Sequence, residues 1–167
     1  LLTTLSDQTY IGAYVPHNLV LMSDIHRLKY AMYLNNDAYE ALKKMIDAMP
    51  NEIANDFYVK EAYTSFTDLQ YSNPNLAGKD ERQLGHTVSI ASKSIAYHEF
   101  KTAALSQWLE AHSYEYGFIL RYPKRMASST NHVYDAHYYR YVGKKNANKI
   151  YKENSCIEEY NQKEAAE

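Results

Sequence analysis

A helical spacing of apolar residues over residues 37–49 constrains the fold more than any other feature of this sequence. In the stretch DAYEALKKMIDAM, apolar side chains recur at intervals of three and four, which predicts an amphipathic helix with one buried face. Asp37 and Glu40 have the spacing of a capping box, and Pro50 prevents the helix from continuing. The residues of the predicted buried face are Ala38, Leu42, Met45, Ile46 and Met49.

A second helix is predicted over Phe100–Tyr116. Gly117 follows it at the position where a glycine commonly ends a helix. The residues of its predicted apolar stripe are Phe100, Ala104, Trp108 and Ala111.

Short segments rich in β-branched and aromatic residues lie around these two helices and predict strands. The predicted strands are Thr9–Val15, Phe57–Thr64, His86–Ala91, Phe118–Tyr122 and Val133–Val142. The remaining predictions are a loop at Asn73–Asp80, a polar connection at Lys124–Asn131, a helix at Gly143–Lys152 and a last short turn at Ile157–Gln162. Interspersed helices and short strands predict an α+β fold, with a small, mostly antiparallel sheet flanked by helices.

Length and composition limit the functions to consider. The 167 residues predict one domain, and 46% hydrophobic residues are typical of a globular chain. Because 18 basic residues are balanced by 20 acidic ones, the chain has no basic field for nucleic acid. Cys156 is the single cysteine, which excludes an intramolecular disulfide.

No stretch has the roughly 18 consecutive apolar residues of a membrane-spanning helix. The chain begins LLTTLSD, without an initiating Met, and we expect it to be a mature or cut fragment. A signal or a membrane tether could therefore lie upstream of it.

Three segments together resemble a known family. They are ERQLGHTVSI, WLEAHSYEYGFILRYP and VYDAHYYRYVGKKNANKIYKE. They are similar to the zinc D-alanyl-D-alanine carboxypeptidases of the VanY type, which trim peptidoglycan stem peptides. The matching runs are Trp108-Leu109, Tyr116-Gly117-Phe118, Arg121-Tyr122-Pro123 and Arg140-Tyr141-Val142-Gly143. The resemblance implies the VanY or LAS-type carboxypeptidase fold over residues 1–167, and an extracytoplasmic place in a bacterial cell envelope.

The family's first metal signature is altered in this sequence. The family has serine-x-histidine, a glycine three residues after the histidine, and an aspartate four residues after the glycine. With Gly85 as the glycine, Asp80 stands at the serine position, Arg82 at the histidine and Ser89 at the aspartate. The two zinc ligands of this signature are therefore replaced.

The second signature, glutamate-proline-tryptophan-histidine, is altered as well. Asp135 stands at the general-base glutamate, His137 at the tryptophan and Tyr138 at the ligand histidine. Thr64 stands where the family has an arginine that grips the substrate. The resemblance thus implies three degenerate zinc-ligand positions and no catalytic residue, with Asp135 only at the position of the base.

The replacing residues are unsuited to zinc. A guanidinium carries no acceptor, and serine and tyrosine are poor zinc donors, so we expect no metal cofactor. We hypothesise that Arg82 supplies positive charge instead of zinc, that Asp135 accepts its two N–H groups, and that Ser89 and Tyr138 complete the bonds. This arrangement would plug the site or leave a cationic spot for a peptide carboxylate. A buried ion pair that only keeps the pocket closed is the simpler alternative.

A displaced metal site is a further alternative, with His86, His132, Asp135 and His137 as potential ligands. Asp135 and His137 would share a face if they lie two apart on one strand. The residues predicted to line the pocket are Thr64, Asp80, His86, Asp135 and His137.

Three functions remain open at this point. The first is a catalytically inactive carboxypeptidase-like domain that binds a peptidoglycan stem peptide or an envelope protein. The second is an active zinc D,D- or L,D-carboxypeptidase that uses displaced ligands. The third is a structural domain of a larger protein, because a fold alone does not define a function.

Overall fold

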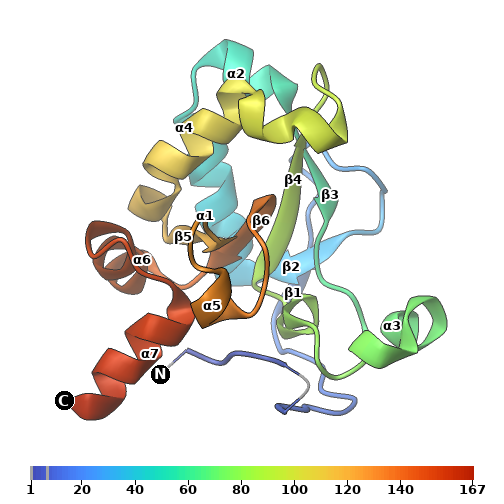
Figure 1. Ribbon diagram of the computed structural model, residues 1–167. Helices are drawn as coiled ribbons and strands as arrows, with labels where there is room; N and C mark the ends of the chain where they lie inside the picture. The colour runs from blue at the N-terminus through green and yellow to red at the C-terminus, as the bar shows by residue number, and fades with distance from the viewer. Residues whose placement is uncertain (1, 7) are drawn as a thin grey trace.

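A four-stranded antiparallel sheet of order β3-β4-β6-β5 lies at the centre of the computed structural model, which describes residues 2–6 and 8–167 (Figure 1). A separate antiparallel pair, β1-β2, lies beside it. The strands are β1 Leu19–Leu21, β2 Tyr33–Asn35, β3 Phe57–Glu61, β4 Thr87–Ser92, β5 Phe118–Tyr122 and β6 Asp135–Tyr141. The α+β architecture predicted from the sequence is confirmed.

Helices surround this sheet, and α1 and α4 provide much of the packing. The α-helices are α1 Asn36–Asp47, α2 Asn51–Asp56, α3 Phe66–Ser72, α4 Ala104–His112, α5 Ala127–Thr130, α6 Lys144–Lys152 and α7 Ile157–Ala166. The 3-10 helices are η1 Pro74–Leu76, η2 Glu81–Leu84, η3 Tyr97–Thr102 and η4 Ser113–Tyr116. In Figure 1, α1, α2 and α4 lie on one side of the sheet and α3 lies apart on the other. No helix in residues 2–6 and 8–167 has the length and apolar content needed to cross a membrane.

The core lies between the sheet and the helices α1 and α4. Leu42 and Met45 of α1 and Leu109 of α4 belong to one buried apolar cluster with Ile90 of β4 and Tyr139 of β6. The apolar spacing in residues 37–49 thus correctly predicts the buried face of α1. Burying each such side chain contributes roughly 1.5–3 kcal/mol, so this cluster supplies much of the driving force for folding.

The start of α1 differs from the prediction. Asn35, and not Asp37, is the capping residue, because its Oδ1 accepts hydrogen bonds from the backbone N–H groups of Asp37 (3.0 Å) and Ala38 (3.3 Å). Glu40 forms an ion pair with Lys43 at 2.9 Å. Pro50 follows the end of α1, as predicted. It is also the N-cap residue of α2, a helix that the sequence analysis did not predict.

The predicted strand at Thr9–Val15 is wrong. The segment contains only an isolated bridge between Ser6 and Thr9. Its backbone is satisfied in other ways: Ile11 N–H bonds Gly78 O at 2.9 Å, and the buried Gln83 amide donates to Gly12 O (2.8 Å) and Tyr14 O (3.0 Å). A glutamine side chain therefore takes the role that a neighbouring strand would have.

The predicted single helix over Phe100–Tyr116 is divided into η3, α4 and η4. Its buried face contains Leu105 and Leu109, while Ala104 and Ala111 are exposed and Trp108 is half-buried, so the predicted stripe is displaced. Gly117 ends the helical region with φ of +89°, as predicted.

Two further helical segments differ from the predictions. The missed helix α3 starts at Ser65, whose Oγ accepts a hydrogen bond from Asp68 N–H (3.0 Å) and donates one to Asp68 Oδ2 (2.8 Å). This serine-x-x-aspartate spacing is a helix-start signal that could have been recognised. Helix α7 extends well beyond the predicted turn at Ile157–Gln162.

A buried ion network lies on the side of the sheet away from α1 and α4. Arg121 of β5 donates to both carboxylate oxygens of Glu81, from Nε to Oε2 (2.8 Å) and from Nη2 to Oε1 (2.9 Å), and both side chains are 2% exposed. Arg121 also bonds both oxygens of Glu158 on α7 (2.6 and 3.0 Å). Arg140 of β6 lies 3.0 Å from Glu81 Oε2 and donates to the carbonyl oxygen of Thr3.

This network connects the sheet with η2, α7 and the N-terminal segment. Burial raises the pKa of Glu81, but the two arginines outweigh burial and hold the pKa below its ordinary value. Glu81 is therefore ionised at neutral pH and pairs with two cations. The ends of the chain also meet here, because Leu2 and Asn161 exchange hydrogen bonds of 2.8 and 2.7 Å beside α7 (Figure 1).

We predict that Glu81→Gln lowers the free energy of unfolding by about 3–5 kcal/mol, because it leaves buried guanidinium groups without a full counter-charge. Urea denaturation followed by circular dichroism would measure the change. Lys163→Ala is the matched control, because it breaks an exposed ion pair with Glu153 and should cost at most about 1 kcal/mol. Equal losses in the two variants would contradict the structural role of Glu81.

Candidate functional site

A hollow of about 370 Å³ lies on the same side of the sheet as the ion network. We call it the Arg82 hollow. It combines carboxylates, one guanidinium and aromatic rings contributed by β3, η2, β5 and β6. The residues that define it are Glu61, Asp80, Arg82, Tyr122, Asp135 and Tyr138.

Arg82 is held from two directions. Asp80 caps η2 by accepting the Arg82 backbone N–H at 2.9 Å, and its carboxylate also accepts from Arg82 Nε (3.0 Å) and Nη2 (2.8 Å). Arg82 Nη1 lies 3.1 Å from Glu61 Oε2. Burial opposes the charge of Arg82, but the bonds to Asp80 outweigh it and raise the pKa above the ordinary value, so the guanidinium stays protonated.

Glu61 reaches Arg82 through an irregularity in the sheet. The β3-β4 register shifts between Val59 and Glu61, so that Val59 pairs with Ile90 and Glu61 pairs with Ser89. Bulges of this kind redirect a side chain relative to regular alternation. The sequence analysis missed Glu61, because the position of a bulge is not encoded in apolar periodicity.

Ser89 and Tyr138 lie across from each other on neighbouring strands, as Cα partners of β4 and β6. Ser89 is buried, and Tyr138 lines the Arg82 hollow. Burial and the Asp80 carboxylate raise the pKa of Tyr138 well above its ordinary value, so its hydroxyl stays neutral. The Tyr122 ring packs beside the Tyr138 ring with centroids 5.7 Å apart, which gives the hollow an aromatic wall.

The hypothesis that Asp135 accepts the guanidinium of Arg82 is wrong. Asp80 and Glu61 take that role, while Asp135 Oδ1 accepts the backbone N–H of His137 at 2.9 Å. Asp80 is two residues from Arg82 in sequence. Because Asp80 caps η2 by accepting the backbone N–H of Arg82, the two side chains are brought together. Asp135 does line the hollow, as predicted.

The predicted histidine ligands do not come together. The His137 ring stacks between Tyr97 (3.8 Å) and Phe100 (4.4 Å), and its nitrogens lie 2.7 Å from Ile90 O and 2.9 Å from Tyr97 O. The His137 side chain therefore does not lie on the same face of β6 as that of Asp135. Regular alternation fails here because the β5-β6 register shifts between Leu120 and Tyr122, next to the pairing of Tyr122 with Asp135.

His86 lines a separate hollow with Arg140, where burial and then the arginine lower its pKa and keep it neutral at pH 7. His132 lines the Arg82 hollow and stacks on Tyr122 at 3.9 Å. Among residues 2–6 and 8–167, no three His, Cys, Asp or Glu side chains are grouped so that they could hold a metal ion.

Thr64 lies beside the hollow and not among the residues that line it. Its backbone N–H bonds Arg82 O at 3.4 Å, and its hydroxyl donates to Ala62 O at 3.2 Å. Of the five predicted pocket residues, Asp80 and Asp135 therefore line the Arg82 hollow, whereas Thr64, His86 and His137 do not. The missed wall residue Tyr122 directly follows Arg121 in the arginine-tyrosine-proline run.

Residues 67–144 match the family model described as "VanY: D-alanyl-D-alanine carboxypeptidase". The chain belongs to the VanY family. It is 34% identical over 124 residues to a D-alanyl-D-alanine carboxypeptidase of Enterococcus faecalis (strain ATCC 700802 / V583), a match that covers 73% of this chain and 44% of the relative. The chain spans about half the length of the curated relatives it matches, between 44% and 63%.

Solved structures of VanY-like proteins share the fold. The LdcB LD-carboxypeptidase, whose structure was described for peptidoglycan recognition, is 28% identical with a TM-score of 0.81, covering 91% of this chain and 80% of that one. A vancomycin resistance D,D-pentapeptidase VanY solved with Zn(II) is 25% identical with a TM-score of 0.73, covering 95% and 97%. These similarities confirm the carboxypeptidase-type fold inferred from the sequence.

We predict that Arg82→Ala lowers the free energy of unfolding by about 1.5–3 kcal/mol, since Asp80 loses a charge-assisted, two-bond partner in a largely buried setting. Chemical denaturation would measure this loss. Lys101→Ala, an exposed position in η3, is the control and should stay within about 0.5 kcal/mol. An unchanged stability of Arg82→Ala would show that the ion pair has no structural role.

Proposed function

We propose that residues 1–167 act as a single carboxypeptidase-like domain that binds peptidoglycan stem peptide, or an envelope protein that carries a similar group, without hydrolysing it. The observation that carries this proposal is the pairing of Arg82 with Asp80 and Glu61 in the Arg82 hollow. Arg82 occupies the position that the resemblance assigns to a zinc-ligand histidine. Membership of the VanY family supports a place in the cell envelope for this domain.

The side chains at the three ligand positions do not fit zinc. Arg82 stays protonated and offers no lone pair, Tyr138 stays a neutral phenol, and Ser89 is a buried hydroxyl. Zinc sites use imidazole, thiolate or carboxylate donors, typically three of them in a catalytic site. Asp135, at the position of the general base, would then have no metal-bound water to deprotonate.

The charge of the Arg82 hollow indicates which part of a peptide it would hold. Among the residues that the structure describes, four carboxylates line it, and Glu81 among them is paired with Arg121 and Arg140. The other three, of Glu61, Asp80 and Asp135, stand against the cations of Arg82 and Lys79. Because Arg82 is already paired, a free peptide carboxylate would meet net negative charge, which argues against the cationic spot that the sequence left open as one alternative to a plugged site. A peptide amine beside the Tyr122 and Tyr138 rings is the better electrostatic match.

The first experiment measures zinc, hydrolysis and binding in the same preparation of purified protein. We expect near-zero zinc by elemental analysis, no release of D-alanine from a lysine-containing stem pentapeptide, and saturable binding of that peptide by calorimetry. Acetylation of the lysine amine should weaken binding. About one zinc per chain together with D-alanine release would instead support the alternative of an active carboxypeptidase with displaced ligands.

The second experiment restores the family's ligand types in the variant Arg82→His/Ser89→Asp/Tyr138→His. If these positions correspond to the zinc ligands, the triple variant should bind zinc stoichiometrically while the starting protein does not. Arg82→His/Tyr138→His, which lacks the carboxylate, is the matched control and should bind zinc more weakly. A folded triple variant that binds no zinc would contradict the assignment of these three positions.

A further inference from the structure

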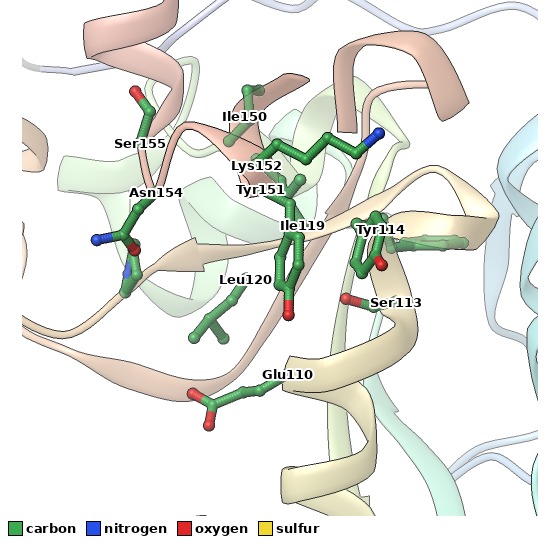
Figure 2. Close-up of a pocket in the computed structure, with 12 residues that line it drawn as sticks. Glu110, Ser113, Tyr114, Ile119, Leu120, Ile150, Tyr151, Lys152, Asn154 and Ser155 are labelled. Atoms are coloured by element: carbon green, nitrogen blue, oxygen red, sulfur yellow. The ribbon is translucent and has the colours of Figure 1, made fainter. Parts of the chain in front are cut away.

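A second hollow, of about 430 Å³, lies beside the outer strand β5, where η4 and the end of α6 approach it (Figure 2). We call it the edge hollow. Its volume lies within the roughly 300–1,000 Å³ of small-molecule sites. Among the residues that line it are Glu110, Ser113, Tyr114, Leu120, Tyr151 and Asn154.

Aromatic and apolar groups form part of its surface. The rings of Tyr114 and Tyr151 stack with centroids 3.8 Å apart and planes 8° from parallel, and Figure 2 shows both rings within the hollow. Ile119 and Leu120 add aliphatic surface from β5. Tyr151 nevertheless remains 45% exposed, so an amphipathic ring is available to a ligand.

Polar groups accompany these rings. Ser113 is only 3% exposed and lines the edge hollow. A serine hydroxyl can both donate and accept a hydrogen bond, so a ligand group in the hollow could pair with it. Glu110 lines the hollow and accepts a bond from the Tyr134 hydroxyl at 3.1 Å.

This combination selects the chemistry of a ligand. A phosphate would be repelled by Glu110 and, among the residues that the structure describes, would find Lys152 as the one cation of the lining. A purely aliphatic ligand would offer no hydrogen bond to the Ser113 hydroxyl or to the Asn154 amide. A sugar ring has an apolar C–H face to place on a tyrosine and hydroxyl or amide groups to bond with Glu110, Ser113 and Asn154.

The two hollows are neighbours along β5. Tyr122 lines the Arg82 hollow, and the adjacent Pro123 lines the edge hollow. On β6, Asp135 lines the first, and the preceding Tyr134 bonds Glu110 of the second. A branched polymer whose peptide enters the Arg82 hollow would therefore bring its glycan close to the edge hollow.

We propose that the edge hollow binds an N-acetylated hexosamine unit of the glycan to which the stem peptide is attached. This inference rests on the proposed function, because it places both ligands on one polymer. It adds a saccharide subsite formed by α4, η4, β5 and the end of α6.

The test uses a β-1,4-linked N-acetylglucosamine tetrasaccharide as the probe and maltotetraose as the comparison, with nuclear magnetic resonance titration of the whole chain. We expect saturable shifts with the first sugar and at least tenfold weaker binding of the second. Tyr151→Ala and Ser113→Ala should each weaken binding of the first sugar at least fivefold. Tyr71→Ala, at a 95% exposed tyrosine on α3, is the matched control and should bind as the unchanged chain does.

The outcome is separate from that of the stem-peptide experiment. Stem-peptide binding that persists in Tyr151→Ala, with loss of sugar binding, supports two distinct subsites. No saturable shift with the N-acetylglucosamine tetrasaccharide, or equal binding by folded Tyr151→Ala, overturns the saccharide proposal even if the stem peptide binds. Loss of stem-peptide binding alone would overturn the proposed function and leave the sugar result to stand by itself.

Discussion

The buried ion pair between Glu81 and Arg121 is the contact on which the geometry of the site depends. Glu81 lies between Asp80 and Arg82 in the short helix η2, and its carboxylate is bonded twice to an arginine of β5. Because the pair is almost fully buried, moving Glu81 would expose an uncompensated charge to a low-dielectric interior. The position of Arg82 above the sheet is therefore determined by its neighbour as much as by its own partners.

The wider network extends this constraint to distant parts of the chain. Arg140 and Glu158 bring β6 and α7 into contact with the same two groups, and Arg140 also bonds the backbone at Thr3. Two carboxylates balance two guanidinium groups, so the network is neutral as a whole. A neutral buried network costs less to desolvate than any of its charges alone, and its directional bonds admit few alternative arrangements.

Apolar periodicity in the sequence predicts the helices and strands whose packing is regular. It fails to predict segments whose backbone N–H and C=O groups are hydrogen-bonded by side chains instead of by a neighbouring strand. The helix around Leu42 and the strand around Arg121 follow from apolar spacing and from a following proline. The segment 9–15 has strand-like residues, yet Gln83 bonds its carbonyl groups from the side. Such a contact between residues about seventy positions apart leaves no local pattern in a single sequence.

The same limit separates what could be predicted about the site from what could not. The resemblance to the family placed Asp80, Arg82, Asp135 and Tyr138 in one region, and the structure brings these four to one hollow. It did not predict which carboxylate meets Arg82, because that depends on a register shift that turns Glu61 inward and on the cap at Asp80. Partner choice among several nearby carboxylates is decided by backbone geometry, which motif spacing does not contain.

The chemistry of the Arg82 hollow follows from a difference between a metal ion and a guanidinium. A zinc ion keeps open coordination positions that can polarise a water molecule or a carbonyl group. Arg82 has directed N–H groups: Asp80 accepts from two of its nitrogens, and Glu61 forms an ion pair with the third. Positive charge bound in this way is neutralised locally, and the contacts of Arg82 with Asp80 and Glu61 hold η2 against β3.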